Sequence, residues 1–114
     1  FNIYNERYDR KRVLMYYLIV SFSYKNTDIQ TREKLAFNSE IEKRDFLDKV
    51  VASQYINEAI LVSTCNRIEI IASVNNINLS AQDIINILHQ KSSISEDELS
   101  NRADIYEDKG AIHH

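Results

Sequence analysis

At three predicted helix starts in this chain, a serine or threonine is followed three residues later by glutamate or glutamine, a pairing typical of such starts. The pairs are Thr27 with Gln30, Ser39 with Glu42, and Ser95 with Glu98. In such a pair the hydroxyl accepts a hydrogen bond from a backbone N–H, and the longer side chain returns one. These signatures predict helices over about 28–34 and 40–54, and a further short helix after Ser95.

A fourth helix is predicted to begin after Ser80. Asp83 is its expected capping partner, and Leu79 is placed to pack on Ile84 as a hydrophobic staple. The two adjacent apolar pairs in 40–54, which are Phe46, Leu47, Val50 and Val51, form one apolar helical face. This helix therefore has one side suited to packing against a sheet.

Four segments between these helices have strand character. Residues 15–22 (MYYLIVSF) and 58–63 (EAILVS) are apolar, 67–74 (RIEIIASV) alternates, and 103–107 (ADIYE) is short. The main order is therefore β-α-β-β-α-β, which predicts an α+β, ferredoxin-like fold: a four-stranded antiparallel sheet with helices on one face.

Composition excludes several classes of protein. The chain has no proline, and its one glycine is Gly110, so neither a dinucleotide fingerprint nor a P-loop can be formed. The net charge of −3 gives no general attraction to nucleic acid. One cysteine and the histidines His89, His113 and His114 do not make a zinc site, so no metal is expected. No membrane span or signal peptide is visible, and a reducing, cytoplasmic setting is expected.

The first fourteen residues differ from the rest in charge. They carry a net +2, whereas the remaining hundred residues carry −5. We interpret residues 1–14 as a leader, an upstream extension or a cloning remnant, with Met15 as the natural start. An ordinary N-terminal arm is the alternative.

The single cysteine, Cys65, stands in the STCNR stretch that links the second and third predicted strands. Free cysteines are most often buried and inert, but a turn between strands projects into solvent. Arg67 favours the thiolate form or binds a substrate carboxylate. The turn's N–H groups, with the hydroxyls of Ser63 and Thr64, would stabilise an oxyanion. From these residues alone, a packing cysteine and a nucleophile both remain open.

STCNR, followed by IEI, resembles the active-site motif of the glutamyl-tRNA reductase family. The segment LIVSFSYKNTDIQTREKLAF is similar to that family's opening strand and first helix, and Arg32 and Glu33 match there. Ser23 and Tyr24 depart from the family's Asn and His. The closing YEDKGAIHH is similar to a family segment that leads to a histidine, and His114 occupies that position.

This resemblance covers residues 15–114 and implies the N-terminal catalytic domain of an NADPH-dependent reductase. In that family a cysteine thiolate attacks the ester of glutamyl-tRNA. The thioester is then reduced to glutamate-1-semialdehyde, the precursor of tetrapyrroles such as porphyrins. Carried over, Cys65 is the nucleophile and His114 assists. The implied glutamate site consists of Thr64, Asn66 and Arg67, with Arg67 as the carboxylate partner.

The resemblance also implies what lies outside the chain. NADPH is bound by a domain absent here, a helical domain makes the full-length protein a homodimer, and glutamyl-tRNA(Glu) and glutamate-1-semialdehyde aminomutase are the expected partners. Two alternatives stay open. The first alternative concerns His114, which would have no catalytic role and would be either a solvated helix residue or, with His113, a tag remnant. The second alternative concerns the whole chain, which would then be a non-catalytic ferredoxin-like module that binds a ligand or RNA.

Overall fold

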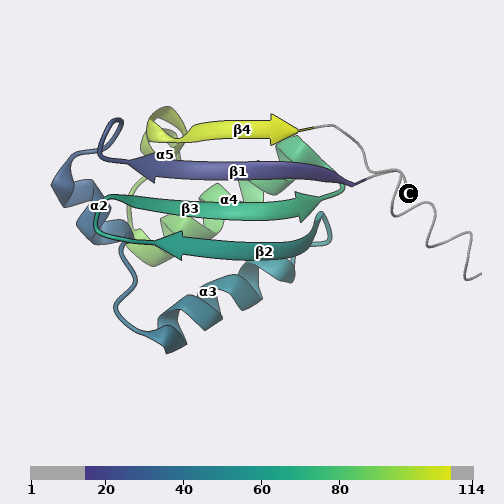
Figure 1. The fold of residues 1–114 in the computed structure, drawn as a ribbon, viewed down its shortest axis with the longest axis horizontal. Helices are drawn as coiled ribbons and strands as arrows, with labels where there is room; N and C mark the ends of the chain where they lie inside the picture. Colours follow the sequence, from purple (N-terminus) through teal and green to yellow (C-terminus); the bar gives the residue numbers. More distant parts are fainter. Residues whose placement is uncertain (1–14, 109–114) are drawn as a thin grey trace, which may run out of the picture.

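A computed structural model of the chain describes residues 15–108 (Figure 1). Residues 1–14 and 109–114 lie outside the described part, so the interpretation of 1–14 and the role of His114 stay predictions. The elements follow in the order β1 (Tyr16–Ser23), α2 (Ile29–Leu35), α3 (Glu40–Val51), β2 (Ile56–Ser63), β3 (Arg67–Val74), α4 (Ile77–Ser92), α5 (Glu96–Arg102) and β4 (Asp104–Asp108).

The four strands form one antiparallel sheet in the order β2-β3-β1-β4. The strand order and the β-α-β-β-α-β connection confirm the predicted ferredoxin-like, α+β class, with α2 and α5 as additional short helices. Ser23 at the end of β1 lies opposite Arg67 at the start of β3, and Ser63 at the end of β2 lies opposite Ile68. The β1–α2 turn and the β2–β3 turn therefore lie next to each other at the same end of the sheet.

Helices cover one face of the sheet, and Figure 1 shows α4 lying behind the strands. Alternate residues point to that face, because side chains in a strand alternate between the two sides. On β1 these residues are Leu18, Val20 and Phe22, each fully buried. They join one core cluster with buried residues from every helix, including Leu35, Phe46, Val50, Ile84, Leu88 and Leu99. The opposite face is open, since Tyr17, Ile60 and Tyr106 keep 42%, 60% and 56% of their surface exposed.

Two of the predicted helix starts are confirmed. Ser39 caps α3 by accepting from the N–H of Glu42 at 3.1 Å, and Ser95 caps α5 through Glu98 at 3.1 Å. The return bonds differ from the simple pattern. The Glu42 carboxylate accepts from the N–H of Asn38, one residue before the cap, and Glu98 pairs with Arg102. α3 ends at Val51, three residues earlier than predicted.

The predicted cap of the first helix, Thr27, is wrong by one residue. Asp28 caps α2 by accepting from the N–H of Thr31 at 2.8 Å. The Thr27 hydroxyl instead donates to the carbonyl of Ser23 at 2.7 Å and closes the β1–α2 turn. A carboxylate next to the threonine is the stronger acceptor for an orphan N–H, which explains the shift.

The predicted start of the fourth helix at Ser80 is also wrong. α4 begins at Ile77, because Asn76 accepts from the N–H of Leu79 at 2.9 Å. Ser80 is fully buried, and its hydroxyl donates to the carbonyl of Tyr55 at 3.1 Å. The expected capping partner Asp83 accepts from Ser53 instead. Since Leu79 lies inside the helix, it cannot act as an N-terminal staple.

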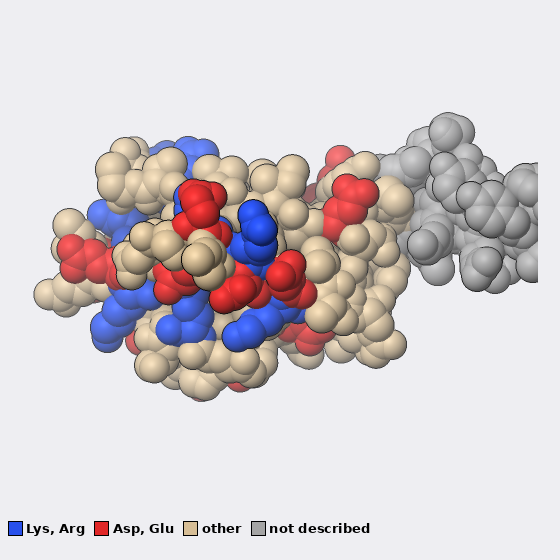
Figure 2. All heavy atoms as spheres, turned by 90° about the horizontal axis from the view of Figure 1, so that it is seen from below, with Lys and Arg blue, Asp and Glu red and all other residues tan. Residues whose placement is uncertain are grey.

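The outer face of α3 carries charges of both signs. Its exposed or half-exposed residues include Glu40, Lys43, Arg44, Asp45, Asp48 and Lys49. Figure 2 shows blue and red side chains intermingled on this side of the molecule. A mixed surface of this kind produces no single-sign field that would attract a polyanion. None of the helices in residues 15–108 has the length and apolar character that a membrane span requires.

Candidate active site

Cys65 lies exposed at the tip of the β2–β3 turn. Thr64 organises this turn with its hydroxyl, which accepts from the backbone N–H groups of Asn66 and Arg67, each at 3.2 Å. The N–H of Thr64 donates in turn to the carbonyl of Arg67 at 2.9 Å. The neighbouring β1–α2 turn adds a bond from the N–H of Tyr24 to the carbonyl of Asn66, at 3.1 Å. The cysteine thus sits in a fixed loop.

These bonds correct one expectation drawn from the sequence. The turn's N–H groups were expected to stabilise an oxyanion, yet those of Thr64, Asn66 and Arg67 are already bonded within the turn. A hydrogen bond that is already formed has to break before its N–H can serve an oxyanion, which offsets the gain. These three groups hold the cysteine in position and are not free donors.

Arg67 belongs to the open face of the sheet. Its guanidinium Nη1 lies 3.5 Å from a carboxylate oxygen of Glu69, two residues further along β3 and therefore on the same side. The same oxygen of Glu69 accepts from the hydroxyl of Ser21 on β1 at 3.2 Å. An ion pair this exposed adds little stability. Its effect is to orient the arginine beside the turn.

A hollow of about 210 Å³ lies beside Cys65 on the side of α2. Its walls are Ile29, Arg32, Glu33 and Ala36 from α2 and its C-terminal cap, with Thr64 and Cys65 from the turn. The helix α2 packs at the end of the sheet through the buried side chains of Thr31 and Leu35. This packing places α2 beside the cysteine turn, and the pocket lies between them. Arg67 is not among its lining residues, since its side chain belongs to the other face.

Both ends of α2 are held by charged side chains. At the N-terminus, the Asp28 carboxylate accepts from Thr31. At the C-terminus, Lys91 of α4 donates to the carbonyl of Ala36 at 2.8 Å, and its ammonium lies 4.3 Å from the ring centre of Phe37. Burial lowers the pKa of Lys91, because desolvation disfavours its charged form. The wall of the pocket is therefore fixed to the rest of the domain.

The cap at Asp28 predicts a dependence of stability on pH. Hydrogen bonds from Thr31, first from its side chain and then from its N–H, lower the pKa of Asp28 below 3.8. A carboxyl group with a lowered folded-state pKa stabilises the fold above its unfolded pKa, and this contribution is lost as the pH falls through the folded value. Asp28→Asn keeps an N-cap acceptor that does not titrate. We expect it to reduce the fall in melting temperature between pH 5 and pH 2.

The measurement is thermal unfolding followed by circular dichroism at several pH values. Asp45→Asn is the matched control, because it removes one exposed carboxylate from within α3, away from any helix cap. An acid profile of Asp28→Asn identical to that of the unsubstituted chain would contradict the role given to this cap.

The predicted site residues fall into two groups. Thr64, Cys65, Asn66 and Arg67 share the exposed turn, and Thr64 and Cys65 alone among them line the pocket. His114 lies outside the described residues. Two contributors, Arg32 and Glu69, received no chemical role from the sequence alone. For Glu69 a signal was present, since opposite charges two apart on a strand share a face.

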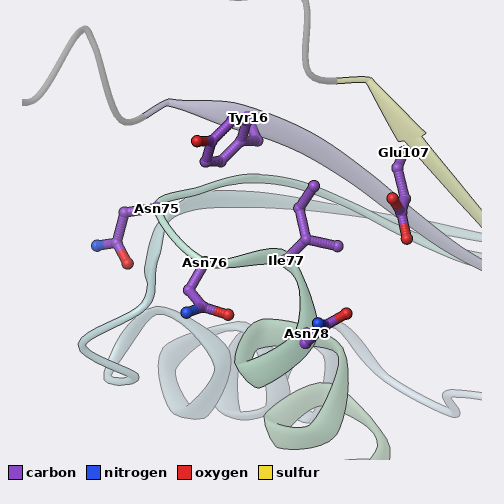
Figure 3. A pocket seen from close by; sticks show the side chains of 6 residues that line it. All are labelled: Tyr16, Asn75, Asn76, Ile77, Asn78 and Glu107. Carbon is purple, nitrogen blue, oxygen red and sulfur yellow. The ribbon is translucent and has the colours of Figure 1, made fainter.

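A second hollow, of about 290 Å³, lies at the far end of the sheet. Figure 3 shows Tyr16 on β1 and Glu107 on β4 above the turn that leads from β3 into α4, which carries Asn75, Asn76 and Asn78. The eight residues of β3 separate it from the cysteine turn, which corresponds to about 23 Å at the rise of an extended strand. It therefore takes no part in chemistry at Cys65.

Fold and site together define a class: a ferredoxin-like α+β domain that presents one cysteine on a rigid turn beside a pocket. Comparison with known proteins makes the class specific. Residues 20–114 match the family described as "Glutamyl-tRNAGlu reductase, N-terminal domain". The chain belongs to this family.

Two relatives identified by sequence agree with this assignment. Glutamyl-tRNA reductases of Wolinella succinogenes and Aliarcobacter butzleri are each 53% identical to the chain over 100 residues, which is 88% of this chain and 23% of each relative. The chain thus spans about a quarter of the length of these relatives. A solved glutamyl-tRNA reductase from Methanopyrus kandleri is similar at 22% identity with a TM-score of 0.47, covering 78% of this chain and 18% of that one.

Proposed function

We propose that residues 15–114 are the N-terminal catalytic domain of an NADPH-dependent glutamyl-tRNA reductase and that Cys65 is its nucleophile. The observation that carries the proposal is the exposed cysteine of the family motif, held on a rigid turn beside a pocket of about 210 Å³. A nucleophile must reach its substrate, whereas a cysteine used for packing is buried.

The reaction begins at the ester that joins glutamate to the 3′ end of tRNA(Glu). The Cys65 sulfur attacks the ester carbonyl and forms a tetrahedral intermediate. A sulfur–carbon bond then replaces the carbon–oxygen bond, and the tRNA leaves as its 3′ hydroxyl after taking up a proton. The product is a glutamyl thioester on Cys65. Thiolates suit this step, because they are strong nucleophiles near neutral pH.

The other site residues have roles carried over from the family. Thr64, Asn66 and Arg67 are proposed to line the glutamate site, with Arg67 binding the carboxylate. The pairing of Arg67 with Glu69 supports this role, because it holds the guanidinium beside the turn. His114 is proposed to orient the substrate or manage the proton of the leaving group.

Reduction of the thioester requires a hydride, which NADPH supplies when bound to the full-length enzyme. Residues 15–108 do not fit this cofactor. They contain no glycine, and a pyrophosphate approaches backbone closely only at glycine-rich turns. We therefore assign the hydride step and release of glutamate-1-semialdehyde to a domain outside this chain. Homodimerisation, contact with the semialdehyde aminomutase and a cytoplasmic location are proposed for the whole protein on the same family grounds.

The experiment that tests the function is incubation of the purified chain with glutamyl-tRNA and NADPH. We expect a glutamyl adduct on the peptide that contains Cys65, seen by mass spectrometry after an acid quench, and no semialdehyde. The adduct should disappear with hydroxylamine, which cleaves thioesters. Uncharged tRNA is the control.

Two results would count against the proposal. Absence of any adduct on Cys65, in a chain shown to be folded, would remove the catalytic role. Formation of semialdehyde by this chain alone would show that the reductant binds within it.

A further inference from the structure

The pocket beside Cys65 contains a cation that the proposed function does not use. Arg32 of α2 lines this pocket, and its Nη1 donates to the carbonyl of Thr27 at 2.7 Å. The Nε of the same side chain is buried and makes no hydrogen bond in the structure. Buried N–H groups are bonded in the large majority of cases, so an unpaired one calls for an explanation. The guanidinium is thus fixed through one nitrogen and keeps donor capacity for a ligand.

The proposed chemistry places two groups on different sides of the thiol. In the tetrahedral intermediate, the reacting carbon is bonded to the Cys65 sulfur, the oxyanion, the glutamyl α-carbon and the ribose oxygen of tRNA. The glutamyl group is directed to the open face, where Arg67 is proposed to bind its carboxylate. Because the bonds at a tetrahedral carbon diverge, the ribose points away from the glutamyl group. The pocket on the side of α2, which Arg67 does not line, is the space available there.

The walls of this pocket match the three parts of a nucleotide. Ile29 and Ala36 contribute apolar surface for a flat base, and bases also stack on guanidinium groups. The positive charge of Arg32 complements a phosphate, and phosphate contacts position a nucleic acid without reading its sequence. The exposed carboxylate of Glu33 is an acceptor for a ribose hydroxyl. Base, phosphate and sugar each find a partner of suitable chemistry.

We propose that the pocket beside Cys65 binds the terminal nucleotide of tRNA, with Arg32 at its phosphate and Glu33 at its ribose. The identity of this nucleotide as the leaving group rests on the proposed function. The subsite is separate from the glutamate site, because Arg67 binds the one free carboxylate of the acyl group and Arg32 binds a phosphate. The two arginines position the two ends of one ester on either side of the thiol.

The first test compares two acyl donors in the full-length protein: glutamyl-tRNA and the α-thiobenzyl ester of glutamate, which has no nucleotide. In both reactions the Cys65 sulfur bonds to the acyl carbon, and the tRNA hydroxyl or benzyl mercaptan leaves after taking up a proton. The readout is the ratio of the second-order rate constants for thioester formation, tRNA donor over thiobenzyl donor. Arg32→Gln should lower this ratio about tenfold or more, because a hydrogen bond to a charged group is lost with one donor only.

Matched variants assign the effect to the pocket. Lys34→Gln removes one positive charge from an exposed position of the same helix, outside the pocket lining, and should leave the ratio unchanged. Arg67→Gln should slow both donors alike, since both carry the glutamyl carboxylate. A general loss of stability also slows both donors and does not move the ratio. Circular dichroism checks the fold, and Glu33→Ala, which should lower the ratio severalfold, still tests the subsite if Arg32→Gln does not fold.

The second test needs no acyl donor. Adenosine 5′-monophosphate, the terminal nucleotide of tRNA, should slow alkylation of Cys65 by iodoacetamide, a reaction in which a sulfur–carbon bond forms and iodide leaves. The protection should be lost in Arg32→Gln and kept in Lys34→Gln. The rate is read from the peptide that contains Cys65, so nucleotide bound elsewhere in the full-length protein does not contribute.

The outcomes separate this inference from the proposed function. If Arg32→Gln keeps the donor ratio, or slows both donors equally, the inference is overturned while the thioester chemistry stands. If the nucleotide gives no protection, or protects the Arg32→Gln protein equally well, the inference is overturned as well. Protection that depends on Arg32, in a protein that forms no glutamyl thioester, would keep the nucleotide subsite and reject the reductase assignment.

Discussion

Replacement of Cys65 by serine is expected to abolish formation of the glutamyl thioester. A serine hydroxyl is a far weaker nucleophile than a thiolate at neutral pH, and the turn supplies no base to activate it. We expect the single-turnover rate of acylation to fall by about 10³-fold or more. The measurement is a quenched time course with glutamyl-tRNA, in which the adduct on residue 65 is quantified by mass spectrometry.

The same substitution should leave the fold intact, which makes the result interpretable. Cys65 is exposed, and exposed substitutions usually change the free energy of unfolding by less than about 0.5 kcal/mol. Ser100→Ala, an exposed change on α5, is the control for handling and should acylate like the unsubstituted chain. A glutamyl adduct that forms on another residue of the Cys65→Ser chain at the rate of the unsubstituted chain would show that this cysteine is not the nucleophile.

Replacement of Phe22 by alanine is expected to produce a large loss of stability. Phe22 is fully buried near the end of β1, opposite Ile68 on β3. Loss of a buried phenylalanine ring removes apolar contacts and leaves a cavity, which lowers the free energy of unfolding by about 3–5 kcal/mol. That is a large fraction of the roughly 5–15 kcal/mol that holds a typical domain folded.

Urea unfolding followed by circular dichroism measures this effect. Tyr24→Ala is the matched control, because this aromatic ring stands two residues away and is 61% exposed. It should change the unfolding free energy by no more than about 0.5 kcal/mol. A loss below about 1 kcal/mol for Phe22→Ala would contradict the packing described here.

The sequence predicted strand bounds and helix N-caps correctly where only one nearby side chain could act as the cap or where apolar and polar residues alternate. The alternation in 67–74 predicted the bounds of β3, and Ser39 and Ser95 cap the helices they were expected to cap. It failed where two acceptors compete. Asp28 stands next to Thr27 and captures the helix N-terminus, and Asn76 does so four residues before Ser80.

The failure at Ser80 has a tertiary cause. The carbonyl of Tyr55 precedes it by 25 residues along the chain and becomes its hydrogen-bond partner only when the preceding segment packs on α4. A capping signature uses only residues that lie close together in the sequence. It cannot show that a distant buried carbonyl takes the hydroxyl first.

The candidate site divides in the same way. The sequence by itself determined that Cys65 stands on a turn between two strands, because alternation and polarity are local properties of the chain. Only the tertiary structure decided what surrounds the thiol. It directs Arg67 to the open face beside Glu69 and brings Arg32 of α2 to the pocket. The reason is physical: which side chains meet depends on sheet register and on helix packing against the core, and both join residues far apart in sequence.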